Sequence, residues 1–274
     1  MSADGWLRGP QGTCVEFQPR PTSPPLVLKF GGAALASPRR VRLAAHRIAA
    51  HVRDGRKVVA VVSAAGQTTD RILEWCARVS GTVPDEPTRE MDRALATGED
   101  RSAALLALSL ESLGVHARSL RGGEAGIQAT GDFGEGRMAD VSASGLLALL
   151  EQGIVPVVSG FQGTRRDGET VTLGRGASDT TAVALAAALG AECHLIKDVA
   201  AIYDRDPKTD PTAHASTSID HFQLLDLVYA GAGVVRADAV QLAWEMGVVL
   251  CIYRYDAPLS GRCGTVVAPR IEVA

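Results

Sequence analysis

The chain has 274 residues, 46% hydrophobic and 22% charged, which is enough for a full core in one large domain or two small lobes. A net charge of −3 without a long basic run argues against nucleic acid as a partner, and no apolar run is long enough to span a membrane. The five cysteines are scattered and form no CxxC pair, so a reducing cytoplasm is favoured over a disulfide framework or a zinc site.

The first predicted elements follow a segment rich in proline and glycine. Residues 1–25 show little hydrophobic periodicity, and we expect a flexible arm there. The run LVLKF, residues 26–30, predicts a buried strand. A helix follows, with Ser37 as its N-cap and Pro38 at its first position. The run KVVAVVS, residues 57–63, predicts a second strand covered on both faces.

Helical and strand-like segments alternate along the rest of the chain. Helices are predicted over residues 69–79, 99–113, 142–152, 178–189, 218–229 and 237–246. Strands are predicted near residues 115–120, 154–161, 193–199 and 248–253. The segment GTRRDGET, residues 163–170, is typical of a polar hairpin turn. The alternation predicts an α/β fold, a three-layer αβα sandwich around a mainly parallel sheet.

The motif KFGG, which begins at Lys29, stands at the end of the first predicted strand. Glycine lets backbone N–H groups approach an anion closely, and the lysine could supply the charge that a phosphoryl group needs. A simple turn after the strand explains the glycines equally well.

The segment LGRGASD places Arg175 between two glycines, directly before an apolar helix. Ser178 or Asp179 could cap that helix, but capping gives no reason for the arginine. A guanidinium on such a permissive backbone could be aimed at a carboxylate, although a surface arginine remains the alternative.

Two further segments carry charge next to predicted elements. In ATGED, Glu99 is expected at a helix start, where it either interacts with the helix dipole or recognises a substrate ammonium. In KDVAAIYDRDPK, residues 197–208, charged side chains follow a strand and could either contact a nucleotide or be solvated. The histidines show no HExxH spacing, and no GxSxG occurs, so neither a protein metal site nor a nucleophilic triad is expected.

Taken in order, these blocks resemble the catalytic domains of aspartokinases in the amino-acid kinase family. The resemblance extends from about residue 26 to residue 267 and includes KFGG, VVSAAGQTTD, REMDRALATGED, VSGFQG, TLGRGASDTTAVALAAALGA, DVAAIYDRDP and GTVV. It implies the amino-acid kinase fold over residues 26–268, with an acceptor-substrate lobe at 26–165 and a nucleotide lobe at 166–268. The implied reaction transfers the γ-phosphoryl group of ATP, with Mg²⁺ on its phosphates, to the side-chain carboxylate of L-aspartate.

The resemblance also implies roles for individual residues. Lys29 would stabilise the transferring phosphoryl group, with Gly31 and Gly32 as backbone donors, and Asp179 would orient the lysine or the metal shell. Arg175 would bind the α-carboxylate of the amino acid and Glu99 its ammonium. Further hydrogen bonds would come from Thr69 and Ser178, and the nucleotide would contact Lys197, Asp198, Tyr203, Asp206 and Lys208.

Several positions depart from the family pattern. Ala33 and Ala34 replace hydroxyl residues after KFGG, and Ala177 replaces a glycine. Gly233 stands where the family has a nucleotide-contacting lysine, and Lys197 replaces a family Thr or Ser. We therefore expect Lys197 to supply the missing cation from another strand.

Three functions fit this pattern. The first is an aspartate kinase without the ACT domains that sense lysine or threonine. The second is a kinase of the same fold that acts on another small amino or carboxylic acid, and the third is a catalytically weak homologue that binds nucleotide. The resemblance also implies a cytoplasmic homodimer.

Overall fold

The computed structural model describes residues 7–8, 14–15, 24–81, 87–205, 207, 209–210, 212–258 and 264–269. Most of the predicted arm lies outside these residues. Its described part includes the antiparallel pair β1 (Leu7–Arg8) and β2 (Cys14–Val15).

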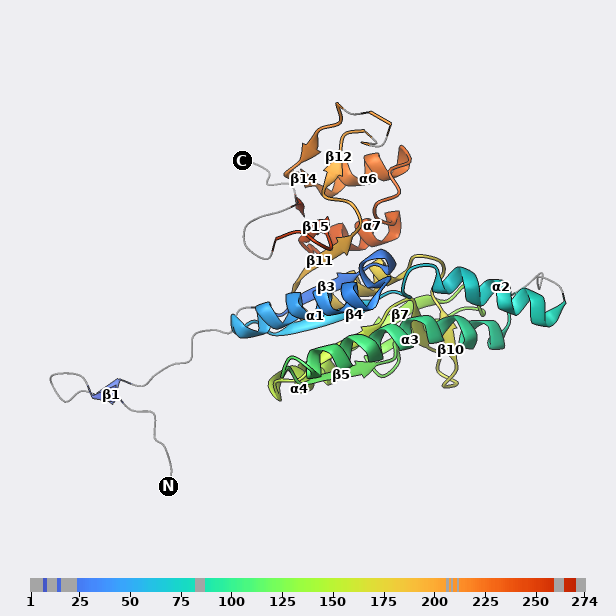
Figure 1. The fold of residues 1–274 in the computed structure, drawn as a ribbon, viewed down its shortest axis with the longest axis horizontal. Helices are drawn as coiled ribbons and strands as arrows, with labels where there is room; N and C mark the ends of the chain where they lie inside the picture. Colours follow the sequence, from blue (N-terminus) through green and yellow to red (C-terminus); the bar gives the residue numbers. More distant parts are fainter. Residues whose placement is uncertain are drawn as a thin grey trace, which may run out of the picture.

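An eight-stranded sheet forms the centre of the molecule (Figure 1). All its neighbouring strands pair in parallel except β15 with β16. The order across the sheet is β14 (Ser218–Asp220), β16 (Thr265–Ala268), β15 (Leu250–Arg254), β11 (Glu192–Lys197), β3 (Leu26–Phe30), β4 (Val58–Val62), β8 (Val155–Ser159) and β5 (Ala117–Leu120). The predicted α/β class with a mainly parallel sheet is therefore confirmed.

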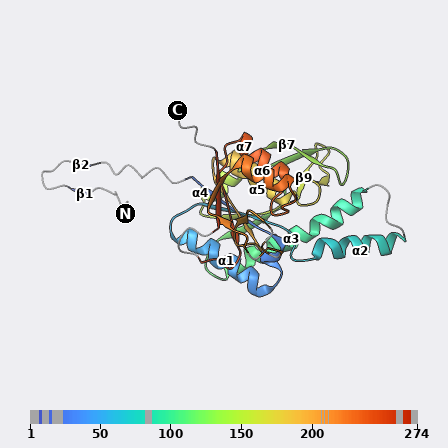
Figure 2. The same cartoon turned by 90° about the horizontal axis from the view of Figure 1, so that it is seen from above.

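Helices cover both faces of this sheet (Figure 2). Side chains alternate along β3, so Leu26 and Leu28 join one hydrophobic cluster and Val27 joins the other. One face carries α1 (Pro38–Arg53) and α3 (Arg89–Glu111). The other carries α4 (Ser144–Glu151), α5 (Ser178–Leu189), α6 (His221–Tyr229) and α7 (Ala237–Glu245). Helix α2 (Thr68–Ser80) projects beyond the sheet beside α3.

The sequence prediction missed a second, smaller sheet. It has the order β10 (Thr170–Thr172), β9 (Gln162–Thr164), β6 (Ile127–Thr130) and β7 (Arg137–Val141). These strands are short, and β7 is largely exposed, so their hydrophobic pattern is weak. The predicted hairpin is confirmed, because β9 and β10 pair antiparallel around residues 165–169.

The start of α1 matches the prediction. Ser37 caps α1 by accepting a hydrogen bond at Oγ from the Arg40 N–H, and Pro38 begins the helix as expected. The other small strands, β12 (Ile202–Tyr203) and β13 (Ala215–Ser216), pair beyond the end of β11. Among the described residues, no helix combines the length and the apolar character needed to cross a bilayer.

Candidate active site

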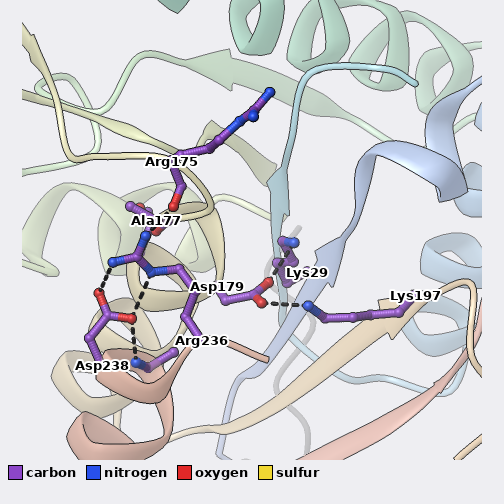
Figure 3. A network of polar contacts seen from close by, with 9 residues as sticks. Lys29, Arg175, Ala177, Asp179, Lys197, Arg236 and Asp238 are labelled. Carbon is purple, nitrogen blue, oxygen red and sulfur yellow. Dashed lines mark hydrogen bonds and ion pairs between the residues drawn. The ribbon is translucent and has the colours of Figure 1, made fainter. Parts of the chain in front are cut away.

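Two lysines and one aspartate meet where the carboxyl ends of two central strands approach the start of a helix (Figure 3). Lys29 lies in β3, Lys197 ends β11, and Asp179 lies in the first turn of α5. The Nζ atoms of Lys29 and Lys197 are each 2.5 Å from an Asp179 oxygen, Oδ1 and Oδ2 respectively. β3 and β11 are adjacent parallel strands, which is why their carboxyl ends present both lysines together.

Burial and mutual charge shift the pKa values within this lysine cluster (Lys29, Asp179 and Lys197). Burial alone would raise the pKa of Asp179, but the two ammonium groups outweigh it and hold the pKa below its ordinary value. Burial also lowers the pKa of Lys197, with the charge of Lys29 acting in the same direction and Asp179 opposing it. One carboxylate faces two ammonium groups, so the cluster attracts a further anion.

Glu99 is buried close to this cluster. Its Oε1 accepts a 2.8 Å hydrogen bond from the Ala64 N–H, and Ala64 follows β4. Its Oε2 is buried without a hydrogen-bond partner among the described residues. Burial raises the pKa of Glu99 from 4.5 to about 7, although the Ala64 N–H and the charge of Lys29 act in the opposite direction. An ammonium group is the ligand that would satisfy this carboxylate.

The expectation that Glu99 begins a helix is wrong. The helix starts at Arg89, with the Thr88 side chain accepting a hydrogen bond from the Met91 N–H, and Glu99 lies in its interior. The helix dipole at an N-terminus therefore does not explain this glutamate. Thr88 followed by acidic residues was the sequence signal for the true start.

The Arg175 loop has the backbone that its sequence predicted. Gly174 and Gly176 adopt φ values of 79° and 83°, a left-handed conformation that glycine favours. The Arg175 guanidinium, however, points away from the lysine cluster (Figure 3). It forms an exposed ion pair with Asp70 in the first turn of α2. The structure therefore brings Arg175 to α2, beside the helical turn that contains Thr69, and not directly to Lys29.

Ser178 and Asp179 do not cap α5, so that interpretation is wrong. The N-cap residue is Ala177, which provides no side-chain hydrogen bond. Ser178 is buried against Gly160, where an added Cβ would come within 3.0 Å of the Ser178 side chain. Thr69 is half-buried near the start of α2.

The two glycines after Lys29 differ in what they can donate. The Gly31 N–H donates a 2.9 Å hydrogen bond to the Ile196 carbonyl, and its role as an anion donor stays a prediction. Within the described residues, no hydrogen bond engages the N–H of Gly32. Gly32 therefore remains available as a backbone donor.

The remaining predicted nucleotide contacts extend beyond the end of β11. Asp198 is exposed directly after Lys197, and Tyr203 is half-buried in β12. Asp206 and Lys208 lie outside the described residues. Gly233 is exposed, and a Cβ there would meet no atom within 4 Å.

Sequence reasoning missed Asp70 and Arg236. The guanidinium of Arg236 donates to the Arg175 carbonyl and forms two 2.8 Å hydrogen bonds with the Asp238 carboxylate (Figure 3). Asp70 sits next to Thr69 in the block VVSAAGQTTD, so position in a recognised block was the available signal. Arg236 carried no comparable signal, because the Arg175 carbonyl that it contacts lies 61 residues earlier in the sequence.

The chain is similar in sequence to known aspartokinases. The chain is 41% identical over 249 residues to the aspartokinase of Mycobacterium tuberculosis strain H37Rv, and 40% identical to that of Corynebacterium glutamicum. Each match covers 90% of this chain and 58% of the relative, so the chain spans less than two thirds of these proteins.

Solved structures agree with these matches. The aspartate kinase from Synechocystis superposes with a TM-score of 0.76 at 38% identity, over 89% of this chain and 40% of that one. Aspartokinase III of E. coli, in complex with aspartate and ADP, superposes with a TM-score of 0.78 at 22% identity, over 91% of this chain and 65% of that one. The second likeness shows the fold alone. Residues 24–253 match the Amino acid kinase family, and the chain belongs to that family.

Proposed function

We propose that the chain is an aspartate kinase, which transfers the γ-phosphoryl group of ATP to the side-chain carboxylate of L-aspartate and yields 4-phospho-L-aspartate and ADP. The observation that carries the proposal is the buried cluster of Lys29, Asp179 and Lys197 at the carboxyl ends of β3 and β11. The aspartokinase relatives, at about 40% identity, support aspartate as the acceptor.

The donor set of the lysine cluster fits a triphosphate. Two ammonium groups and the N–H of Gly32 are cationic or hydrogen-bond donors, and phosphate oxygens are anionic acceptors. Each Asp179 oxygen is paired with a lysine, and Mg²⁺ would be held through the phosphates. When bound, Mg²⁺-ATP supplies the phosphoryl group and neutralises part of its charge.

The acceptor needs no general base in this chemistry. An aspartate side chain has a pKa of about 3.9, so the attacking oxygen is already an anion at neutral pH. The main barrier is repulsion between this carboxylate and the triphosphate. Lys29 and Lys197 offset that repulsion, and Asp179 holds both ammonium groups in place.

The amino and α-carboxyl groups of aspartate would be held by residues near the carboxyl ends of the central strands. The unpartnered Glu99 Oε2 suits the ammonium. Arg175 would exchange Asp70 for the α-carboxylate, with Thr69 and Ser178 nearby. In this proposal residues 26–165 bind the acceptor, and residues 166–268 bind the nucleotide through Lys197, Asp198 and Tyr203, with Asp206 and Lys208.

A cytoplasmic homodimer completes the proposal. The free thiols of Cys76 and Cys193 suit a reducing compartment. Sedimentation analysis of the purified chain measures the oligomeric state directly.

A hydroxamate-trapping assay with ATP, Mg²⁺ and a panel of amino acids tests the proposed reaction. We expect trapped aspartyl phosphate, and no product from glutamate or from aspartate amides. Trapping of a different acyl phosphate would make the chain a kinase for another acid. ATP binding without any trapped product would contradict kinase activity altogether.

A further inference from the structure

Three potential metal ligands lie together on the α1 face of the sheet, at the end of β11 opposite Lys197. Glu192 begins β11, and His194 lies two residues later on the same face. Cys251 in β15 is the direct cross-strand neighbour of His194. The strands, not sequence spacing, bring the three side chains together, which explains why the sequence shows no zinc motif.

The ligand atoms are close enough to share one ion. A carboxylate oxygen of Glu192, a ring nitrogen of His194 and the Sγ of Cys251 all lie within 4.8 Å of one another. Ligand atoms around a tetrahedral zinc ion are about 3.5 Å apart, given its usual bond lengths of about 2.0–2.3 Å. Small side-chain rotations would therefore close the site around an ion. All three residues are half-buried, so an ion from solvent can reach them.

Neighbouring side chains already orient these ligands. The Nδ1 of His194 is 3.0 Å from the Tyr253 hydroxyl, and its Nε2 faces the Glu192 carboxylate at 3.6 Å. A proton on Nδ1 that is donated to Tyr253 leaves the Nε2 lone pair free for a metal. Arg56 donates a 2.8 Å hydrogen bond to Glu192, which fixes the carboxylate.

The charges around the cluster set the class of ion. The Glu192 carboxylate accepts a hydrogen bond from Arg56 and lies 3.6 Å from the His194 Nε2. Arg56 opposes a cation, and a Cys251 thiolate together with the carboxylate would offset both charges of a divalent ion. A mixed O, N and S donor set matches zinc and not Mg²⁺ or Ca²⁺.

We propose that Glu192, His194 and Cys251 form a site for a zinc-class divalent cation that links β11 to β15. The ion stabilises the sheet from the end of β11 that is remote from Lys197, and it takes no part in phosphoryl transfer. His51 on α1, whose ring centroid is 6.4 Å from that of His194, is the nearest further imidazole and a candidate fourth ligand. Binding releases the Cys251 proton to solvent, because the thiolate is the ligand.

Titration of metal-stripped, full-length chain with Co²⁺ tests this site, since a cobalt–thiolate bond gives a charge-transfer absorption band. We expect one ion per chain and a band that Zn²⁺ abolishes by displacement. The Cys251→Ser variant should lose the band and bind zinc at least about 100-fold more weakly, whereas Cys76→Ser, on the distant helix α2, should behave as the parent chain.

A second variant, Tyr253→Phe, tests whether the Tyr253 hydroxyl orients His194 for metal binding. Tyr253→Phe removes only the hydroxyl beside His194 and should weaken zinc binding by about 10-fold, with an unchanged far-ultraviolet circular dichroism spectrum. A parent chain that takes up no zinc or cobalt at micromolar concentration would overturn the proposal. A cobalt band that persists in Cys251→Ser would also overturn it. Neither outcome depends on whether the chain phosphorylates aspartate.

Discussion

At the scale of single residues, Lys197 in the lysine cluster distinguishes this chain from the family pattern. Gly233 carries no side chain where the resemblance implies a lysine, while Lys197 contacts Asp179 from β11. An ammonium at this position attracts the phosphates of a nucleotide. We propose that Lys197 replaces the missing lysine.

Replacing Lys197 with alanine should raise the KM for ATP by about 10-fold or more, because a charge-assisted phosphate contact contributes about 1.5–3 kcal/mol. Steady-state kinetics at saturating aspartate measure the change. Lys57→Ala removes a lysine at the amino end of β4, opposite the strand ends that carry Lys29 and Lys197; it is the matched control and should leave the KM unchanged. An unaltered KM for ATP in Lys197→Ala would refute the replacement.

Glu99 predicts a pH dependence of substrate binding. Its pKa of about 7 in the empty protein means that half of the carboxyl groups are protonated at neutral pH. Below pH 7, aspartate binding must first release this proton, so the KM for aspartate should rise by up to about 10-fold per pH unit. In Glu99→Gln the KM should be higher and lose this dependence. Parallel pH profiles of parent and variant would show that Glu99 does not face the substrate.

The same carboxyl group stabilises the fold most at low pH, whereas it binds aspartate best at high pH. Its folded-state pKa lies above the unfolded value of 4.5, so its contribution to the free energy of unfolding is greatest below pH 4.5 and declines up to about pH 7. Glu99→Gln keeps the acceptor for the Ala64 N–H. Its stability relative to the parent should therefore increase by about 3 kcal/mol between these pH values, as measured by urea unfolding.

The contact between Lys29 and Asp179 was implied by the resemblance, but the contact between Arg175 and Asp70 was not. The Lys29 Nζ and Asp179 Oδ1 atoms are 2.5 Å apart, while the roles of both residues in phosphoryl transfer stay a prediction. The pairing of Arg175 with Asp70 depends on how α2 and the loop before α5 meet in space. The sequence around Arg175 does not indicate this contact.

At the scale of elements, α3 positions Glu99 because a glycine lets the helix approach the loop after β4. A Cβ at Gly98 would lie 2.9 Å from the Ala64 Cβ. The close approach outweighs the usual cost of glycine in a helix interior. It also brings the Ala64 N–H within reach of Glu99.

Gly98→Ala should therefore destabilise the fold by about 1–3 kcal/mol and weaken aspartate binding, since the helix must shift away from Ala64. Thermal unfolding and the KM for aspartate measure the two effects. Gly145→Ala in α4 is the matched control, because a Cβ there meets nothing within 4 Å and alanine favours a helix. Equal melting temperatures for the two variants would contradict a close-packing role for Gly98.

Elements with strong local signals were predictable, and elements formed by distant pairing were not. The bounds of α5 match the predicted residues 178–189, because its apolar run ends at Gly190 in a left-handed conformation. The small sheet was missed because β6 obtains its partners from β7 and β9, and its own sequence is only four residues long. Such short strands are stabilised by their neighbours and not by propensity.

At the scale of the whole molecule, the two proposed lobes share one sheet. β3 from the first half pairs with β11 from the second along five residue pairs. Helix α5 from the second half also packs on Val27 of β3 and Val59 of β4 within one hydrophobic cluster. Neither half has a complete core without the other.

The chain should consequently unfold in one cooperative transition in urea. Far-ultraviolet circular dichroism reports all helices. Of the three tryptophans that fluorescence reports, Trp75 on α2 and Trp244 on α7 lie in different halves. We expect the two probes to give the same midpoint. Distinct midpoints would mean that residues 26–165 and 166–268 fold as independent units.

The most direct test of the central claim is the single-turnover rate of phosphoryl transfer from ATP to aspartate in Lys29→Ala, compared with the parent chain and with Lys57→Ala. If Lys29 in the buried cluster stabilises the transferring group, the rate should fall by at least about 100-fold in Lys29→Ala, equivalent to about 2.7 kcal/mol, and remain at the parental value in Lys57→Ala. Transfer by Lys29→Ala at the parental rate would contradict the account.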